Sequence, residues 1–484
     1  MPAFAKLIDE GVQGTLLAWP NMNSAAAWTS MVTGCNPGQH MIYGFGDVSA
    51  QDAATWRPFT RADCKRDPFW RLISAMGRRV GVINVPLTYP AEAINGFMLS
   101  GSDASGIGRS GLAHPAGILD ELRRQGIKHI LDVPNLARLS SRATRKVPLS
   151  LQQMVDARSR SILHLMRTQP WDVLMAVFVA TDRVQHHFWP TDQVPMDDPA
   201  WTPIRHIYQQ IDAFLHVALT LIGRDTMVMV VSDHGFGPQR PALHHLNTLL
   251  AQLGLLHFRG GSQSPDSTTL KKLLVWGRKW IPLQLQGPLA RAFPGLHLRA
   301  VNDSIMLNID WSKTQAFIDP LGGQLRINLQ GRQREGIVPP HAYQQLRDRL
   351  QRIMRQLREP STGLQVAQAV HTREEVYHGP YTHLAEDLLI RWKDGLRYNA
   401  LSYEAEGEAA IVRAPNEATG EGRGLGWSGT HRPEGVFLAW GPRIKHGATI
   451  EGVTVYDIAP TVLHLQNHLI PRDMDGRVLT DVFN

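Results

Sequence analysis

Cysteine is scarce in this sequence of 484 residues, which contains two, Cys35 and Cys64. Two cysteines cannot form the disulfide framework that stabilises many secreted domains, so the simplest prediction is a reducing, cytoplasmic location. Long apolar runs are also missing, because the longest, residues 173–180, is far shorter than the ~20 residues of a membrane-spanning helix. The opening MPAFAKLIDEGV lacks the pattern of a secretory signal. The sequence therefore predicts neither a transmembrane segment nor a signal peptide.

The sequence also lacks a strong excess of either positive or negative charge. The formal net charge is +7, spread over 484 residues of which 19% are charged. Such a thin positive balance mildly favours anionic partners, but it is more typical of a solvated basic surface than of a nucleic-acid groove. We therefore expect no nucleic-acid partner.

Apolar segments with two different periods alternate along the chain. Residues 78–86, 171–180 and 226–233 are apolar at most positions and predict strands, while residues 150–168 and 204–222 have helical spacing. Strands that lack an alternating pattern and are separated by helices indicate a parallel sheet covered on both faces. The predicted fold class is therefore α/β, with a mostly parallel central sheet and helices on both faces.

Residues 246–300 differ in composition from the rest of the chain. A Gly/Ser/Pro-rich loop at 260–268 precedes a basic, apolar stretch at 271–293. Such a stretch can dock on a membrane surface or an acidic partner, but we favour a lid within the domain, because tertiary context usually decides how amphipathic segments pack. We predict one domain over 1–484, with 246–300 as a lid or cap insertion. Further strands are predicted at 325–330, 386–392 and 435–442.

Acidic and histidine side chains stand at the ends of three predicted strands. Asp182 and His186 follow one strand, Asp233 and His234 follow another, and His431 precedes a third. Ligands of open parallel sheets bind beyond the carboxyl ends of the strands, so these side chains are expected to converge. A four-residue gap places Asp182 and His186 on one face if a helical turn begins there. Three such ligands with one open position are typical of a catalytic zinc site.

The stretch VVSDHGFGP suggests a second site beside the first. Asp233 and His234 would begin this site, and Gly235 and Gly237 would let the backbone turn so that both side chains reach one ion. In the alternative interpretation, Asp233 caps the next helix and His234 is a packed histidine at the rim. His187, beside His186, is more typical of packing than of metal ligation.

A candidate nucleophile lies near the start of the chain. Ser24 is followed by the small residues Ala25 to Ala27, which predicts that it heads a helix. A hydroxyl at a helix N-terminus lies where an anion is also favoured. The alternative is that Ser24 serves only as the N-cap.

Several segments together resemble the alkaline phosphatase superfamily, specifically its type I phosphodiesterase/nucleotide pyrophosphatase family. These segments are SAAAWTSMVTGCNPGQH, TDRVQHHFW, SDHGFGP, RINLQGRQREGIV, SGTHRPEG and the closing YDIAPTVLHLQNHLIPRDMDGRVL. The resemblance covers nearly the whole chain and implies an alkaline-phosphatase-like fold. It also implies a hydrolase of phosphate monoesters or diesters, with sulfate esters and phosphonates as substrates of some members.

The resemblance implies roles for individual residues. It assigns Asp182, His186 and His431 to one divalent metal, and Asp233 and His234, together with the nucleophile Ser24, to another. Both metals are expected to be zinc, with manganese as the alternative. The implied mechanism is a two-step displacement with a phospho-serine intermediate, in which the second metal activates Ser24 and the first stabilises the leaving oxygen and then supplies hydroxide.

Two departures from the family pattern bear on activity. The family has an N-terminal strand that ends in a metal-binding Asp, whereas this sequence begins with residues resembling those that follow that strand, and Asp9 lies in a helix-like segment. The resemblance therefore implies a fold lacking the N-terminal strand and a second site short of one carboxylate. In addition, Ala27 occupies the position of an asparagine that nucleotide pyrophosphatases use to hold a phosphoryl oxygen, which disfavours nucleotide substrates.

We interpret the chain as a metal-dependent phosphodiesterase-type hydrolase of a small phosphate ester. One alternative is a catalytically impaired or inactive member that acts as a binding protein, which metal stoichiometry would distinguish. Others are a sulfatase or a phosphomutase of the same superfamily. SAAAW lacks the Pro and Arg of the sulfatase C-x-P-x-R motif, which argues against a sulfatase.

Overall fold

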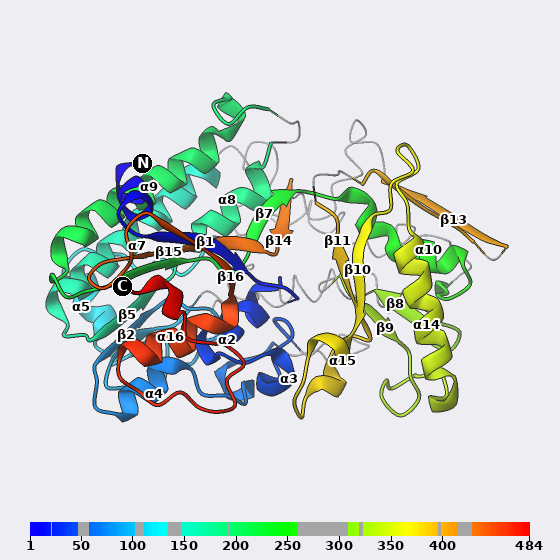
Figure 1. Cartoon of the computed structure of the whole chain (residues 1–484), viewed down its shortest axis with the longest axis horizontal. Coiled ribbons are helices and arrows are strands. Elements are labelled where there is room, and N and C mark those ends of the chain that lie inside the picture. Colours follow the sequence, from blue (N-terminus) through cyan, green and yellow to red (C-terminus); the bar gives the residue numbers. More distant parts are fainter. Residues whose placement is uncertain are drawn as a thin grey trace, which may run out of the picture. The chain divides into compact units, whose positions relative to one another are not determined.

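The structure is a computed structural model in which the chain forms two compact units (Figure 1). The residues that the structure describes are 1–20, 22–46, 58–101, 111–133, 147–190, 194–259, 308–318, 323–394, 398–405, 407–414 and 428–484. The first unit comprises Met1–Tyr43, Phe59–Pro238 and Gly426–Asn484, and the second comprises Gly44–Pro58 and Gln239–Leu425.

Two four-stranded sheets form the centre of the first unit. One has the order β16-β1-β15-β6, with β1 (Val12–Leu17), β6 (Val228–Val231), β15 (Glu434–Trp440) and β16 (Ala448–Thr454). The other has the order β4-β3-β2-β5, with β2 (Val80–Ile83), β3 (Gly96–Leu99), β4 (Ala113–His114) and β5 (Val173–Ala176). β2 is parallel to β3 and β5, and β1 is parallel to β16. β15 runs antiparallel to both β1 and β6, and β4 runs antiparallel to β3.

Helices cover both faces of these sheets (Figure 1). One face carries α2 (Ser24–Thr33), α4 (Phe69–Ala75) and α16 (Ile458–Leu465). The other carries α1 (Pro2–Asp9), α5 (Ile118–Arg124), α7 (Val147–Thr168), α8 (Ala180–Phe188) and α9 (Thr202–Leu221). The period of two along each strand divides the side chains between the faces: Phe437 packs on the α2 side and Leu438 on the α9 side. Shorter helices of this unit are α3 (Pro37–His40), η1 (Arg61–Asp63), η4 (Pro199–Trp201), η10 (Val455–Asp457) and η11 (Thr480–Val482).

The second unit has its own sheet and core. Its antiparallel sheet has the order β10-β11-β9-β8, with β8 (Ala316–Ile318), β9 (Leu325–Ile327), β10 (Ala367–Thr372) and β11 (Leu388–Trp392). The helix α14 (Pro340–Gln356) packs on this core through buried side chains at helical spacing, namely Leu346, Leu350, Ile353 and Met354. The remaining elements are α10 (Leu246–Gln252), α15 (Arg373–Val376), β12 (Ala400–Ala405), β13 (Glu408–Arg413), η5 (Pro241–His245) and η8 (Thr382–Leu384).

The predicted alternation of strands and helices is confirmed, and the sheet arrangement is confirmed in part. The predicted helices at 150–168 and 204–222 are α7 and α9, and the predicted strands at 78–86, 171–180 and 226–233 contain β2, β5 and β6. The antiparallel direction of β15 was not predicted. β5 and β6 are half-buried rather than fully buried, because each is the edge strand of its sheet.

Part of the predicted insertion lies outside the described residues. Of residues 246–300, the structure describes 246–259, which begin with α10, and the basic stretch at 271–293 is not among the described residues. One domain with a lid insertion therefore stays a prediction. No helix in the described part of the chain is both long enough and apolar enough to cross a membrane.

Candidate metal centre and nucleophile

The turn after β5 places two potential ligands on one face of a helix. β5 ends at Ala176 and α8 begins at Ala180, so Asp182 lies in the first turn and His186 one turn later. Residues four apart on a helix are neighbours, and Nε2 of His186 lies 3.4 Å from Oδ1 of Asp182. A helical turn therefore begins here, which is the condition under which the four-residue spacing puts the two side chains on one face.

Antiparallel pairing brings His431 to the same place. Phe437 of β15 pairs with Val231 of β6, so the start of β15 lies at the end of β6. The ribbon of β7 (Gly235–Pro238) and β14 (Gly429–Arg432) continues this pairing and sets His431 opposite Phe236. His431 therefore lies beside the segment that carries Asp233 and His234.

The five Asp and His residues among the predicted ligands form two adjoining groups. Nε2 of His431 lies 3.2 Å from Oδ1 of Asp182 and 3.0 Å from Nε2 of His186. The potential ligand atoms of these three residues all lie within 4.8 Å of one another. In the adjoining group, Nε2 of His234 lies 3.2 Å from Oδ2 of Asp233. Oδ1 of Asp182 joins the two groups, because it is 3.9 Å from Nε2 of His234.

The three histidines share one orientation. Each Nδ1–H donates to a backbone carbonyl, so each neutral ring presents the lone pair of Nε2 to the site. The pairs are His186 with Gly429 (3.1 Å), His234 with Gly235 (3.1 Å) and His431 with Met22 (2.7 Å). Nε2 of His186 and Nε2 of His431 are therefore two acceptors facing each other at 3.0 Å. A cation between them would satisfy both lone pairs, and two imidazoles with a carboxylate fit zinc.

Burial keeps these rings neutral. Burial lowers the pKa of His234 to about 4. Burial, followed by the charge of His234, lowers the pKa of His431, and burial also lowers the pKa of His186. Since metal ligation requires the deprotonated ring nitrogen, all three histidines are in the metal-binding form at neutral pH.

The two carboxylates have opposite pKa shifts. Burial alone would raise the pKa of Asp182, but His186, His431 and Arg183 outweigh it and hold the pKa well below its usual range. Burial, followed by repulsion from Asp182, raises the pKa of Asp233 to about 7. Asp182 is thus ionised in the metal-free protein, whereas Asp233 loses its proton at a higher pH than an ordinary Asp.

Ser24 is the first residue of α2 and is not its cap. The N-cap is Asn23, whose side chain accepts the N–H of Ala25 at 3.0 Å. The N-cap alternative for Ser24 is therefore wrong, and its hydroxyl is free to donate to Nε2 of His234 at 2.9 Å. Ala27, where the family pattern has an asparagine, is fully buried in α2.

The glycines after Asp233 have a different role from the predicted one. Gly235 and Gly237 lie in the extended strand β7, so they do not make a turn. A Cβ on Gly235 would lie 1.9 Å from the carbonyl oxygen of Glu434, so glycine is required there for the close approach of the two chain segments.

Two residues at the site were missed by sequence reasoning. The ring of Phe236 lies 4.8 Å from that of His186 and 5.2 Å from that of His431, so it forms an apolar wall beside the ligands. Arg183 donates to Oδ2 of Asp182 at 2.7 Å. Phe236 lies in SDHGFGP and Arg183 lies in TDRVQHHFW, so their closeness in sequence to the predicted ligands was the signal that could have found them.

His187 and Asp9 take no part in the ligand groups found among the described residues. Burial lowers the pKa of His187 to about 4, which agrees with a packing role. Asp9 is exposed at the end of α1.

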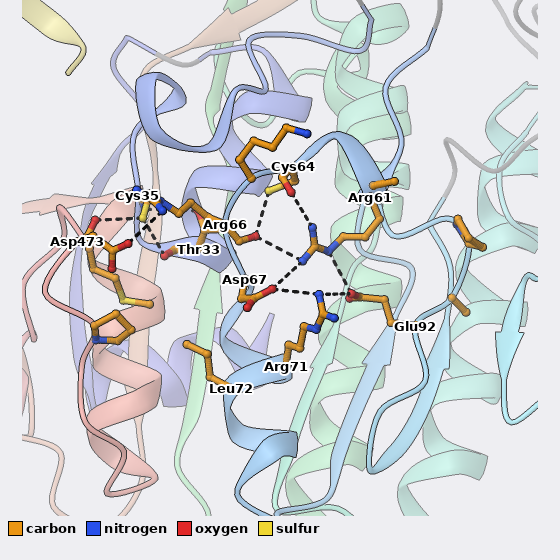
Figure 2. Close-up of a pocket in the computed structure, with 16 residues that line it drawn as sticks. Thr33, Cys35, Arg61, Cys64, Arg66, Asp67, Arg71, Leu72, Glu92 and Asp473 are labelled. Atoms are coloured by element: carbon orange, nitrogen blue, oxygen red, sulfur yellow. Dashed lines mark hydrogen bonds and ion pairs between the residues drawn. The ribbon is translucent and has the colours of Figure 1, made fainter. Parts of the chain in front are cut away.

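A separate cavity of about 590 Å³ lies beside the other end of α2 (Figure 2). Thr33, at the end of α2, lines this cavity and lies nine residues after Ser24, which is about 14 Å along a helix. The arginines in the cavity are paired with carboxylates: Arg71 lies 3.0 Å from Asp67, and Arg61 lies 3.3 Å from Glu92. Most of its positive charge is therefore neutralised within the protein.

Both cysteines of the chain line this cavity and are free thiols (Figure 2). Burial, followed by the charge of Asp475, raises the pKa of Cys35 to about 12. Burial also raises the pKa of Cys64. Because the thiolate is the reactive form, burial disfavours both cysteines as nucleophiles at neutral pH.

Comparisons with known proteins agree with the resemblance seen in the sequence. Residues 1–415 match the model of the family described as type I phosphodiesterase/nucleotide pyrophosphatase. No curated protein matches the chain.

Among solved structures, wild-type alkaline phosphatase PafA is 14% identical, with 99% of this chain and 94% of that chain covered and a TM-score of 0.50. Human ectonucleotide pyrophosphatase/phosphodiesterase 5 is 12% identical, with 100% and 94% covered and a TM-score of 0.45. Phosphonoacetate hydrolase from Sinorhizobium meliloti is 14% identical, with 95% and 88% covered and a TM-score of 0.46. At such identities the similarity to PafA shows a common fold and no more.

Proposed function

The chain belongs to the type I phosphodiesterase/nucleotide pyrophosphatase family and is a hydrolase of the alkaline phosphatase superfamily, and from this premise we propose its metals, nucleophile and substrate class. Asp182, His186 and His431 bind one divalent cation. Asp233, His234 and Ser24 bind a second. The substrate is a small phosphate diester, and the reaction proceeds through a phospho-serine.

One observation carries the metal assignment. The Nε2 atoms of His186 and His431 lie 3.0 Å apart, and each ring already donates its Nδ1–H to a backbone carbonyl. Two facing lone pairs beside the Asp182 carboxylate make a site for a cation, and this donor set suits zinc better than magnesium or calcium.

Ser24 is suited to act as the nucleophile by position and by contact. It stands at the N-terminus of α2, where the helix dipole favours the phosphoryl group. Its hydroxyl lies 2.9 Å from Nε2 of His234, at the edge of the second group. Divalent cations at the two groups would lower the pKa of bound oxygens and neutralise charge on the phosphoryl group.

The proposed reaction consists of two displacements at phosphorus, in which bonds and protons balance. In the first, Oγ of Ser24 bonds to phosphorus, the ester bond breaks, and the proton of the hydroxyl leaves with the alcohol product. In the second, the oxygen of a water molecule bonds to phosphorus and the bond between phosphorus and Oγ of Ser24 breaks. One proton of the water returns to Oγ, and a phosphate monoester is released. The chain's own contribution is to fix the hydroxyl and the helix N-terminus in one orientation.

A second candidate is a protein that binds a single metal and does not hydrolyse esters. One observation favours it: within the described residues, a single group of three or more potential ligands is found, and it contains Asp182, His186 and His431. Asp233 and His234 offer one carboxylate and one imidazole to the other ion. A protein of this kind would bind one equivalent of metal and would not turn over.

The test combines Ser24→Ala with a chromogenic diester, bis-p-nitrophenyl phosphate, and metal analysis by mass spectrometry. We expect Ser24→Ala to abolish the phosphorylated peptide and turnover while it keeps the metal bound at Asp182, His186 and His431. Ser159→Ala, a serine on α7, is the matched control and should behave like the wild type. A phosphorylated peptide from another part of the wild-type chain would refute the role of Ser24.

A further inference from the structure

The two oxygens of Asp182 have different partners. Oδ1 faces the ligand group, 3.2 Å from Nε2 of His431 and 3.4 Å from Nε2 of His186. Oδ2 accepts a hydrogen bond of 2.7 Å from the guanidinium of Arg183. A charge-assisted bond of this length fixes the rotation of the carboxylate. One oxygen is therefore directed at the cation position, and the other is occupied.

The guanidinium of Arg183 is itself held by a second carboxylate. Its Nη2 donates to Oδ2 of Asp132 at 2.8 Å, and its Nε lies 3.4 Å from Oδ1 of the same residue. This two-bond contact matches the planar fork of arginine to the plane of a carboxylate. Since Nη1 points to Asp182, the arginine bridges Asp132 and Asp182 with different nitrogens.

A buried arginine in turn holds the segment that carries Asp132. Arg158 of α7 is 2% exposed and donates to three carbonyl oxygens. Two of these belong to Ile130 and Leu131, directly before Asp132, at 3.2 and 2.7 Å, and the third belongs to Val177, just after β5, at 2.8 Å. Asp132 is thus tied to the same strand end from which Asp182 is presented.

The charges of these connected side chains determine how the removal of any one of them affects cation binding. Asp132, Arg183 and Asp182 carry −1, +1 and −1, which sum to −1. The buried Arg158 beside them carries +1, which is the same in every variant considered. Without the charge of Asp132 the sum is zero, and without the charge of Arg183 it is −2. Without both it returns to −1. The side chains of Asp132 and Asp182 are 15% and 18% exposed, so water screens these charges incompletely.

We propose that Asp132 and Arg183 are positioning residues for the metal centre, which hold Asp182 as a one-oxygen ligand and set the net charge at the cation. This inference rests on the proposed metal binding by Asp182, His186 and His431. Neither residue touches the cation, and both act through Asp182.

The variants Asp132→Asn, Arg183→Met and their combination test the charge balance. Asp132→Asn keeps the shape of the side chain and leaves the charge of Arg183 uncompensated, so metal affinity should fall by about 10-fold, within the range for groups that orient ligands. In the double variant the positive charge of Arg183 is also removed, so the metal affinity should recover most of that loss. If Asp132 and Arg183 served only for folding, the double variant would instead bind metal as weakly as Asp132→Asn or more weakly.

Arg183→Met also tests the one-oxygen arrangement. It frees Oδ2 of Asp182, so a Co²⁺-loaded protein should change its visible absorption spectrum as the coordination number rises. An unchanged spectrum would overturn this part of the proposal. If Arg183→Met does not fold, as judged by circular dichroism, Arg183→Gln replaces it.

The measurement is a titration of the chelator-treated full chain with Zn²⁺ against a competing dye, at low salt. Asp120→Asn is the matched control, because it removes one carboxylate from an exposed ion pair on α5 that does not contact the site. It should leave the affinity unchanged. Wild-type protein that binds no Zn²⁺ would refute the proposed metal centre, whereas tight wild-type binding with no loss in Asp132→Asn would overturn this inference alone.

Discussion

Replacing Asp233 with asparagine should have opposite effects on the metal-free and the metal-loaded protein. Without metal, Asp233 is a largely buried carboxylate, 14% exposed, whose pKa is raised to about 7, by burial first and by Asp182 second. Its ionised form is therefore destabilised in the fold, and an asparagine of the same shape removes this destabilisation. With metal, the same change removes a proposed ligand of the second cation.

The size of the effect follows from the pKa. The pKa of about 7 in the folded protein lies roughly three pKa units above the usual Asp value of 3.8, and 1.36 kcal/mol per pKa unit gives at most roughly 4 kcal/mol. A folded chain that binds its proton more tightly than the unfolded chain loses stability as pH rises. The destabilisation by Asp233 thus grows between about pH 4 and pH 7 and is complete above pH 7. Asp233→Asn should match the wild type near pH 4 and exceed it above pH 7.

Urea unfolding of both proteins from pH 4 to 8.5, with chelator and then with Zn²⁺, measures this difference. The lowered histidine pKa values affect both proteins alike, so the difference isolates Asp233. Asp182→Asn is the contrasting variant, because the pKa of Asp182 is lowered and its charge stabilises the fold. It should reduce the stability of the metal-free protein at neutral pH. Asp233→Asn that is less stable than the wild type at pH 8 without metal would refute the reasoning.

Further predictions concern the metal ligands, the aromatic wall and the cysteines. His431→Ala should lower metal content and hydrolysis together, whereas the exposed His206→Ala on α9 should change neither; full metal content with normal turnover would count against the assignment. Phe236→Ala should lower unfolding free energy by roughly 2 kcal/mol, less than for a fully buried Phe because this ring is half-buried, and should weaken metal binding, as measured by melting and zinc titration. Cys35 and Cys64 should resist iodoacetamide at pH 8 in the native protein and react within minutes in urea, because burial raises both thiol pKa values; rapid native labelling, read by mass spectrometry, would contradict this.

Local patterns in the sequence predicted much of the site. The four-residue spacing of Asp182 and His186 was enough to predict that their side chains share one helix face, because this depends only on the geometry of one helical turn. Asp233 and His234 were also predictable as a pair, because they directly follow an apolar strand. In each case the two residues are close in sequence.

Features that depend on long-range pairing were not predictable in this way. The antiparallel direction of β15, which places His431, depends on pairing with β1 and β6, more than 200 residues away. Asp132 carries no local sign of its role, since its contact with Arg183 spans 51 residues. The role of Gly235 was misread because a close approach by Glu434 cannot be read from neighbouring residues.

The central claim is that Asp182, His186 and His431 form a cation site that the reaction requires. The most direct test is the metal content of the purified wild-type chain, measured together with hydrolysis of bis-p-nitrophenyl phosphate before chelation, after chelation and after Zn²⁺ is returned. We predict two equivalents of bound metal, loss of hydrolysis on chelation and its return with Zn²⁺. Hydrolysis that persists in the fully metal-free protein would contradict the account.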